Sequence, residues 1–243
     1  MSLYLTDKIY IKNDIFYYEK DGKSYKLQDK NWHIHLNEYG WEKLNKQWII
    51  QLNRSTKKRK KNSLFGALDC GGEGDCLFHC IASALNSTQN TTQQTFYDSS
   101  DIRKLVADSI TQEQYDNIIT CYRSMKDLDD FDESWDPYEI DNLEQFKEQL
   151  MTSGHGYWCD HLVLQLVCQA FNINIFILTQ NEWTNTYDKY PLATKYDETK
   201  DSIIVLHENE GHFKLIGHFN DIMITHFTNK TLPLEIKRLY DIV

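Results

Sequence analysis

A cysteine at the start of a predicted helix is the most reactive group in the sequence. In DCGGEGDCLFHCIASALN, residues 69–86, a glycine-rich turn leads into Cys76, and apolar side chains then recur at helical spacing. Unpaired N–H groups at a helix start favour a thiolate, so we expect a lowered pKa for Cys76. The turn formed by Glu73, Gly74 and Asp75 can also donate backbone N–H groups to an oxyanion. The competing interpretation is a small core cysteine at a helix start.

Thiolate chemistry also needs a side chain that takes up and returns a proton near neutral pH, which is the range of histidine. Of nine histidines we select His212, because it follows a turn between two apolar runs and should begin a strand. A position at the end of a sheet holds a base rigidly. His218 is the alternative. Six residues of extended strand span about 20 Å, so only one of the two can face Cys76.

Two helices and four strands should position these groups. Apolar residues recur at helical spacing in 77–85 and 162–171, which predicts helices that each bury one face. Short β-rich runs between turn residues predict strands at 173–178, 202–207, 212–217 and 222–227. Together they predict an α/β or α+β domain with a small central sheet between helices.

The composition excludes several classes of protein. With 243 residues, 41% of them apolar, the chain can form one packed domain and an accessory piece. Its six cysteines are too few for a disulfide scaffold, and its apolar runs are too short to cross a membrane. The first residues lack the features of a secretory signal. We therefore expect a cytoplasmic protein, or a nuclear one, with reduced thiols.

The charge is unevenly distributed. A net charge of −10 argues against a nucleic-acid-binding molecule and favours a basic protein partner or a small substrate. Residues 127–148 carry ten acidic residues and one lysine, which is nearly all of the excess. This segment is interpreted either as solvated, partly helical surface or as a surface that steers a basic partner toward a neighbouring site.

A basic run, RSTKKRKK at Arg54–Lys61, marks the predicted domain boundary. We expect residues 1–62 to form an accessory segment and residues 63–243 the main domain. Alternating residues around Asp21 predict a hairpin, and residues 37–50 predict a short helix. Three interpretations of the basic run are left open: a solvated linker, a nuclear targeting signal and a segment that contacts nucleic acid.

The order of these motifs resembles the ovarian tumour (OTU) family of papain-like cysteine proteases. The segment EGDCLF, residues 73–78, stands where the family has Asp-Gly-Asn-Cys-Leu-Phe. A second helix opened by YWCD, residues 157–160, and later the pair His212-Phe213 follow in the family's order. The similarity spans about residues 64–227. OTU-like proteins of large DNA viruses resemble this chain most, which suggests a viral origin.

The resemblance implies a papain-like OTU fold and the removal of ubiquitin, polyubiquitin or ubiquitin-like modifiers from conjugates. It implies that the Cys76 thiolate attacks the carbonyl of the C-terminal glycine while His212 holds and returns the proton. It also implies substrate contacts by Trp158, Asp160 and Phe213 beside a narrow channel for the ubiquitin tail. No cofactor is expected, and no metal site either, because paired Cys-x-x-Cys ligands are missing.

The match departs from the family at the third catalytic residue. Lys214 stands where many members have an Asp or Asn that accepts the imidazole N–H, and an ammonium has no lone pair to offer. We take Asn220 as the third residue. The alternatives left open are Asp221, Asp69, Asn209 and a two-residue site. Lys214 also leaves open a second function, a catalytically silent module that binds ubiquitin or a host protein.

Overall fold

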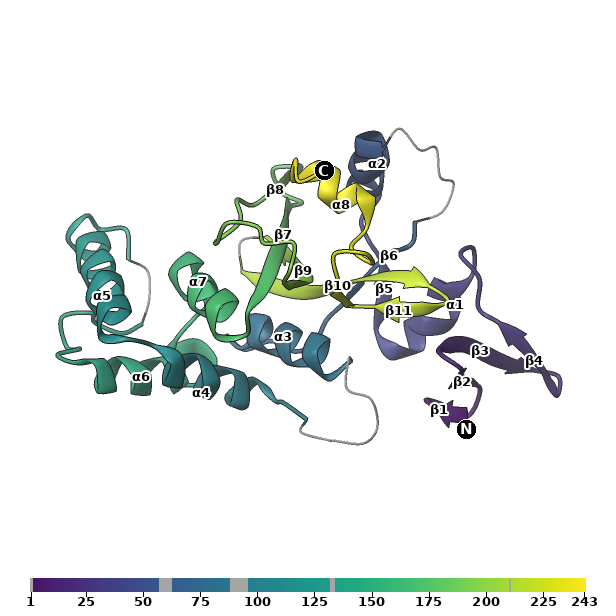
Figure 1. Ribbon diagram of the computed structural model, residues 1–243, viewed down its shortest axis with the longest axis horizontal. Helices are drawn as coiled ribbons and strands as arrows, with labels where there is room; N and C mark the ends of the chain where they lie inside the picture. The colour runs from purple at the N-terminus through teal and green to yellow at the C-terminus, as the bar shows by residue number, and fades with distance from the viewer. Residues whose placement is uncertain (1, 57–62, 88–95, 132–133, 210) are drawn as a thin grey trace.

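The computed structural model describes residues 2–56, 63–87, 96–131, 134–209 and 211–243. A mixed eight-stranded sheet lies at the centre, with helices on both faces and a small antiparallel sheet at the N-terminus (Figure 1). The predicted α+β fold with a central sheet between helices is confirmed.

The central sheet has the strand order β5-β6-β10-β9-β7-β8, with β11 beside β10 and β12 beside β9. Its strands are β5 (Trp41–Lys43), β6 (Phe65–Leu68), β7 (Ile173–Asn181), β8 (Thr186–Lys189), β9 (Asp201–Glu208), β10 (His212–Asn220), β11 (Ile222–Ile224) and β12 (His226–Phe227). Strands β7 and β9 are parallel, whereas β9 and β10 are antiparallel. Three of the four predicted strands are confirmed, and the fourth forms the short strands β11 and β12, separated by Thr225.

Alternate residues of the central strands face two separate cores. In β7, Ile175 and Ile177 face one core, and Phe176 and Leu178 face the other. The period of two along a strand explains why a strand buried on both faces reads as a continuous apolar run. The first core is covered by α3 (Cys76–Asn86), α4 (Ser99–Ser109), α5 (Gln112–Asp127), α6 (Leu143–Met151) and α7 (His161–Ala170). The two predicted helices are α3 and α7, and both are confirmed.

The second core is covered by α2 (Lys46–Thr56) and α8 (Leu234–Leu239), which pack against each other. The short helix predicted over residues 37–50 is wrong in its bounds. Residues 37–39 form one 3₁₀ turn, which ends at Gly40 with a φ of 80°. Residues 41–43 then form β5, and α2 begins only at Lys46.

The N-terminal sheet is a four-stranded meander of β1 (Ser2–Tyr4), β2 (Ile9–Lys12), β3 (Ile15–Lys20) and β4 (Lys23–Lys26). The predicted hairpin is confirmed between β3 and β4, where Asp21 and Gly22 have φ values of 51° and 69°. Positive φ at both central residues is the requirement of a type I′ turn. The sheet packs against Trp32 of α1 (Trp32–Leu36) and against Phe219 of β10.

The domain boundary at residue 62 stays a prediction. Of the segment before it, β5 pairs with β6 in the central sheet and α2 covers the second core, so these two elements belong to the main body. Residues 57–61, most of the basic run, lie outside the described residues. Within the part of the chain that is described, none of the helices has the length and apolar character needed to cross a membrane.

Candidate active site

Cys76 is the first residue of α3 and follows a tight loop, residues 69–75. Glu73 and Gly74 both have positive φ (59° and 88°), so the loop turns sharply before the helix begins. The residue is 8% exposed. Burial raises the pKa of Cys76, although N–H groups of Phe213, Leu77 and Cys76 itself act in the opposite direction. The predicted lowering of this pKa is therefore wrong for this state, because the loss of water outweighs the N–H groups.

His212 is the first residue of β10, as predicted. The turn that precedes it closes through a hydrogen bond from the Gly211 N–H to the Glu208 carbonyl oxygen (3.1 Å). The backbone N–H of the next residue, Phe213, lies close enough to the Cys76 thiol to act on its pKa. The strand that begins with the predicted base thus packs against the helix that begins with the predicted nucleophile, although the two residues are far apart in the sequence.

A carboxylate from the neighbouring strand reaches His212. Asp69 directly follows β6, the antiparallel partner of β10, and its Oδ1 lies 3.2 Å from His212 Nε2. The separation is that of an ion pair, but Nε2 makes no aligned hydrogen bond. Catalytic contacts are often long or poorly aligned before substrate binds. Asp69 was one of the open alternatives for the third residue.

The structure does not bring Asn220 to this group. Asn220 is the last residue of β10, in register with Ile222, and it lies about 26 Å from His212 along the strand. The alternative base, His218, packs edge-on against Phe65 (ring centroids 4.8 Å apart) and lines a separate small cavity. The other two candidates are also engaged elsewhere: Asp221 with Lys26 (2.8 Å) and Asn209 with the backbone N–H of Glu182 (3.0 Å).

Lys214, the departure from the family pattern, has a partner of its own. Its Nζ lies 2.7 Å from Oε2 of Glu208. Because His212 is in register with Glu208 and Lys214 with Leu206, this is a diagonal pair across β9 and β10. Glu208 of the neighbouring strand β9 therefore neutralises the ammonium of Lys214. The carboxylate that faces His212, that of Asp69, follows β6 on the other side of β10.

The loop before Cys76 is fixed by a residue that the sequence analysis missed. The Asp75 carboxylate is buried and bound by Arg103 of α4. Arg103 interrupts the apolar face formed by Ile102 and Val106, and a charged residue at a buried helical position is the signal that could have found it. The loop also rests on residues 152–158, because a Cβ at Gly74 would lie 2.1 Å from the carbonyl oxygen of residue 154.

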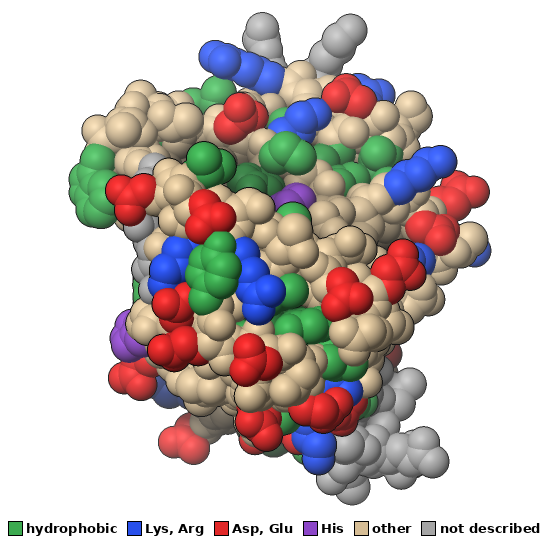
Figure 2. All heavy atoms as spheres, turned by 90° about the vertical axis from the view of Figure 1, so that its left-hand side faces the viewer, with side chains coloured by type: hydrophobic (Ala, Val, Ile, Leu, Met, Phe, Trp, Pro, Cys, Tyr) green, Lys and Arg blue, Asp and Glu red, His purple; other side chains and the backbone are tan. Residues whose placement is uncertain are grey.

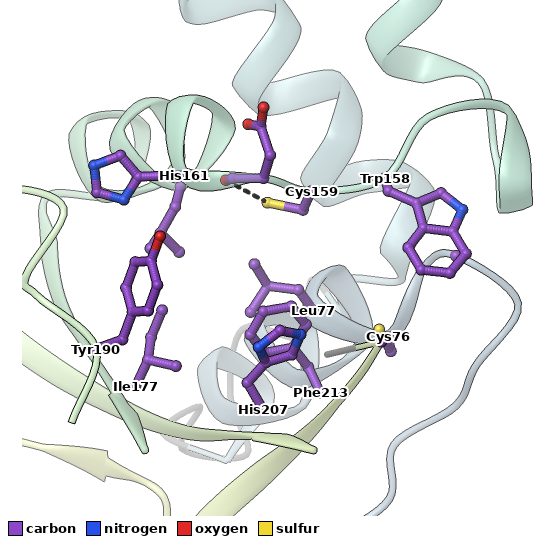
Figure 3. A pocket seen from close by; sticks show the side chains of 13 residues that line it. Cys76, Leu77, Trp158, Cys159, His161, Ile177, Tyr190, His207 and Phe213 are labelled. Carbon is purple, nitrogen blue, oxygen red and sulfur yellow. Dashed lines mark hydrogen bonds between the residues drawn. The ribbon is translucent and has the colours of Figure 1, made fainter. Parts of the chain in front are cut away.

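A cavity of about 210 Å³ opens beside Cys76. Figure 3 shows it extending from Cys76 and Trp158 at one end to His161 and Tyr190 at the other. All three side chains predicted to bind substrate line it: Trp158, Asp160 and Phe213. The Phe213 ring stacks on His207 (centroids 4.4 Å apart), and apolar side chains of α3, α7 and β7 also line the cavity.

Asp160 has a structural role at the cavity wall. Its carboxylate caps α7 by accepting the Val163 N–H (2.9 Å). Burial raises the pKa of Asp160, although backbone N–H groups and the Tyr122 hydroxyl act in the opposite direction. Trp158, in contrast, is 40% exposed at the rim. Substrate contact by these residues stays a prediction.

The acidic segment lies on the helical side of the molecule. Figure 2 shows acidic side chains spread over the face that carries α5 and α6. The exposed acids of this segment among the described residues are Asp127, Asp129, Asp130, Glu139, Asp141, Glu144 and Glu148. All six cysteines are free thiols, and no group of three or more His, Cys, Asp or Glu among the described residues is arranged to hold a metal ion.

Comparisons with known proteins identify the family of the chain. The family model described as OTU-like cysteine protease matches residues 71–219. An OTU deubiquitinase from Wolbachia pipientis wMel is 14% identical with a TM-score of 0.42, over 65% of this chain and 91% of that one. The Hazara virus OTU bound to ubiquitin is 10% identical with a TM-score of 0.41, over 64% and 82%. The viral OTU domain protease of Farallon virus is 14% identical with a TM-score of 0.43, over 64% and 85%. No curated protein matches the chain.

Proposed function

The chain belongs to the OTU-like cysteine protease family, and from this premise we propose that it is a thiol-dependent deubiquitinase. Its reaction is hydrolysis of the isopeptide bond after the C-terminal glycine of ubiquitin or of a ubiquitin-like modifier. One observation supports the proposal: the strand that begins with His212, β10, packs against α3, the helix that begins with Cys76, and Cys76 lines a cleft.

In the proposed mechanism, His212 takes the thiol proton and the Cys76 thiolate attacks the glycine carbonyl carbon. The raised pKa of the free thiol makes this transfer necessary, because little thiolate forms without the base. The oxyanion accepts hydrogen bonds from N–H groups at the start of α3 and in the preceding loop. Collapse of the intermediate expels the lysine amine, which takes the proton from His212, and water then hydrolyses the thioester.

Asp69 is the third residue in this proposal. With Nε2 facing Asp69 at 3.2 Å, Nδ1 is the ring nitrogen left to receive the thiol proton. A carboxylate at this distance orients the ring and stabilises the imidazolium that forms.

Ubiquitin is the proposed partner. The Hazara virus and Wolbachia OTU proteins have been solved bound to ubiquitin, and the acidic face of α5 and α6 could steer a basic protein surface toward the cleft. Action in the cytoplasm or nucleus, in a host cell if the chain is viral, stays a prediction.

Covalent capture tests the proposal. The full chain is incubated with ubiquitin that carries a C-terminal alkyne electrophile. We expect a one-to-one adduct at Cys76 that is lost in Cys76→Ala and kept in Cys121→Ala, which removes an exposed thiol outside the cleft. Tight binding without an adduct would instead identify a silent binding module, and an adduct that survives Cys76→Ala would remove Cys76 from the mechanism.

Neutralising the acidic face tests the partner. The triple variant Asp127→Asn, Asp129→Asn, Asp130→Asn should raise KM for diubiquitin several-fold and flatten its dependence on salt, with kcat unchanged, because exposed charges act mainly on association. The matched control neutralises Asp7, Asp14 and Asp29, which are exposed in the N-terminal region. Equal KM values and equal salt slopes in the two triple variants would exclude the steering role.

A further inference from the structure

The aspartate that precedes the nucleophile does not cap its helix. Asp75 stands at the N-cap of α3, yet its side chain accepts no hydrogen bond from the first turn. Two other aspartates at N-caps of this chain do: Asp98 accepts the Asp101 N–H, and Asp160 accepts the Val163 N–H. Aspartate is among the best capping residues. Something therefore holds the Asp75 carboxylate away from the helix that it begins.

Both carboxylate oxygens of Asp75 are bound on the other side. Oδ1 accepts the Nε–H of Arg103 at 2.7 Å, and the second guanidinium nitrogen lies 2.5 Å from the same oxygen. Oδ2 accepts the Ser153 hydroxyl (2.5 Å) and the Gly154 N–H (3.1 Å). These groups come from α4 and from the segment after α6, and none belongs to α3.

Arg103 is itself held rigidly. It is 1% exposed, and its remaining N–H groups bind the carbonyl oxygens of Leu150 (2.8 Å), Tyr157 (2.8 Å) and Gly74 (3.4 Å). The guanidinium also stacks over the Phe78 ring of α3, 4.1 Å from its centroid. One side chain thus connects the loop before Cys76, α3, the end of α6 and the segment that leads to Trp158.

A free carboxylate at position 75 would oppose the chemistry in two ways. As an ordinary N-cap it would occupy an N–H group of the first turn, which the proposed mechanism reserves for the oxyanion. As a negative charge beside Cys76 it would disfavour the thiolate. The guanidinium removes both effects, because it draws the carboxylate away and neutralises it. The family signature has a neutral Asn here, so this chain needs a compensation that the signature does not.

We propose that Arg103 is a positioning residue of the active site: it holds the Asp75 carboxylate off the first turn of α3 and neutralises it. The N–H groups at the helix start then remain available to the Cys76 thiolate and to the substrate oxyanion. This inference rests on the proposed function for its consequence in catalysis, but its effect on the thiol can be measured without any substrate.

The test is the pH dependence of Cys76 alkylation by iodoacetamide in the full chain, followed by mass spectrometry of the Cys76 peptide. In Arg103→Gln the midpoint should move up by about one pH unit, because an uncompensated carboxylate disfavours the thiolate. In Asp75→Asn it should move down, because the guanidinium is then unopposed. In the double variant it should return close to the wild-type value. Lys104→Gln removes an exposed charge from the next position of α4 and should change nothing.

Alkylation midpoints that move in opposite directions in Arg103→Gln and Asp75→Asn distinguish positioning from structural damage, since a general loosening of the loop would move both midpoints the same way. Shifts of equal sign, or no shift in folded Arg103→Gln, would overturn the proposal. If Arg103→Gln does not fold, Ser153→Ala replaces it; that variant frees only Oδ2 and should move the midpoint up by a smaller amount.

Turnover gives the second measurement. For a fluorogenic ubiquitin amide, Arg103→Gln should lower kcat at least tenfold with little change in KM, and the double variant should recover part of this loss. If the wild-type chain does not hydrolyse the amide, the proposed function fails while the alkylation profiles still decide the role of Arg103. A double variant with a lower kcat than Arg103→Gln would count against positioning. If Arg103 acts by compensating the Asp75 carboxylate, removal of that carboxylate should raise kcat and not lower it.

Discussion

Nε2 of His212 lies 3.2 Å from Oδ1 of Asp69, so the first residue of β10 faces the residue that follows β6. The contact arises from strand pairing: Leu68, the last residue of β6, is in register with Leu215, so the residue that follows the strand, Asp69, lies near the start of β10. This geometry makes Asp69, rather than a residue after the imidazole on its own strand, the group that can orient the base.

Asp69→Ala should therefore lower kcat/KM for a fluorogenic ubiquitin amide by about 10- to 100-fold, since a misoriented imidazole transfers the proton poorly. Asn220→Ala is the matched comparison and should stay within about threefold of wild type, because Asn220 lies at the far end of β10. The opposite result, a large loss in Asn220→Ala and a small one in Asp69→Ala, would exchange the two assignments.

Lys214 should not be an obstacle to catalysis. Although burial works against its charged form, the hydrogen bond and the charge of Glu208 raise the pKa of Lys214, so the ion pair persists throughout the neutral range. We expect Lys214→Gln to keep kcat/KM within about threefold and to cost about 1 kcal/mol of unfolding free energy, measured in urea. A tenfold change in kcat/KM in either direction would show that this ammonium acts on His212.

Substitution by alanine should have very different effects at two glycines of the loop, Gly74 and Gly72. A Cβ at Gly74 would lie 2.1 Å from the carbonyl oxygen of residue 154, and its φ of 88° is unfavourable for other residues, whereas a Cβ at Gly72 meets nothing within 4 Å. Gly74→Ala should therefore lower the melting temperature and reduce kcat/KM at least 100-fold because the loop must move. Gly72→Ala should match wild type in both. Similar values for the two variants would mean that the loop adapts freely.

The residues closest in sequence were the most predictable part of the site. Cys76 and its loop form one contiguous segment, and α3 follows from apolar spacing alone. The position of His212 at the start of a strand was predicted correctly from the turn that precedes it, and its role as the base stays a prediction. The pKa of Cys76 was mispredicted, because the burial of the thiol depends on how β10 packs against α3, and the local sequence carries no information about that packing.

Partners contributed by distant elements were harder to find. Asp69 was only one of several alternatives for the third residue, since its contact depends on the pairing of β6 with β10. Arg103 was missed altogether: its place among the apolar residues Ile102 and Val106 indicates a buried charge, but the local sequence does not show that its partner is Asp75. The helix predicted over residues 37–50 failed for a similar reason: pairing of β5 with β6 overrides local helical preference.

The part of the chain before residue 62 contributes side chains to the second core. Trp48 of α2 is 0% exposed in the second core, whereas Trp183, at the turn between β7 and β8, is 82% exposed. Trp48→Ala should cost about 3–5 kcal/mol of unfolding free energy, measured by urea denaturation, and Trp183→Ala less than about 0.5 kcal/mol. A small cost for Trp48→Ala would mean that α2 is a dispensable attachment.

The buried pair of Asp75 and Arg103 should also set part of the acid sensitivity of the fold. Burial works against the ionised form, but the bonds from Ser153 and Arg103 keep the pKa of Asp75 below its usual value. A lowered folded-state pKa means that the unfolded chain binds the proton more readily, so this contribution is complete above about pH 4 and is lost as the pH falls further.

Asp75→Asn should therefore cost about 3–5 kcal/mol at pH 7, where it leaves a buried guanidinium unpaired. Its deficit relative to wild type should shrink as the pH falls below 4, because a protonated Asp75 and an Asn are both neutral. Urea denaturation of the two proteins between pH 2.5 and 7 measures this difference, and Asp7→Asn, an exposed site, provides the control. A difference in unfolding free energy that stays constant across this range would show that the ionisation of Asp75 contributes nothing to stability and that the guanidinium contributes only through packing.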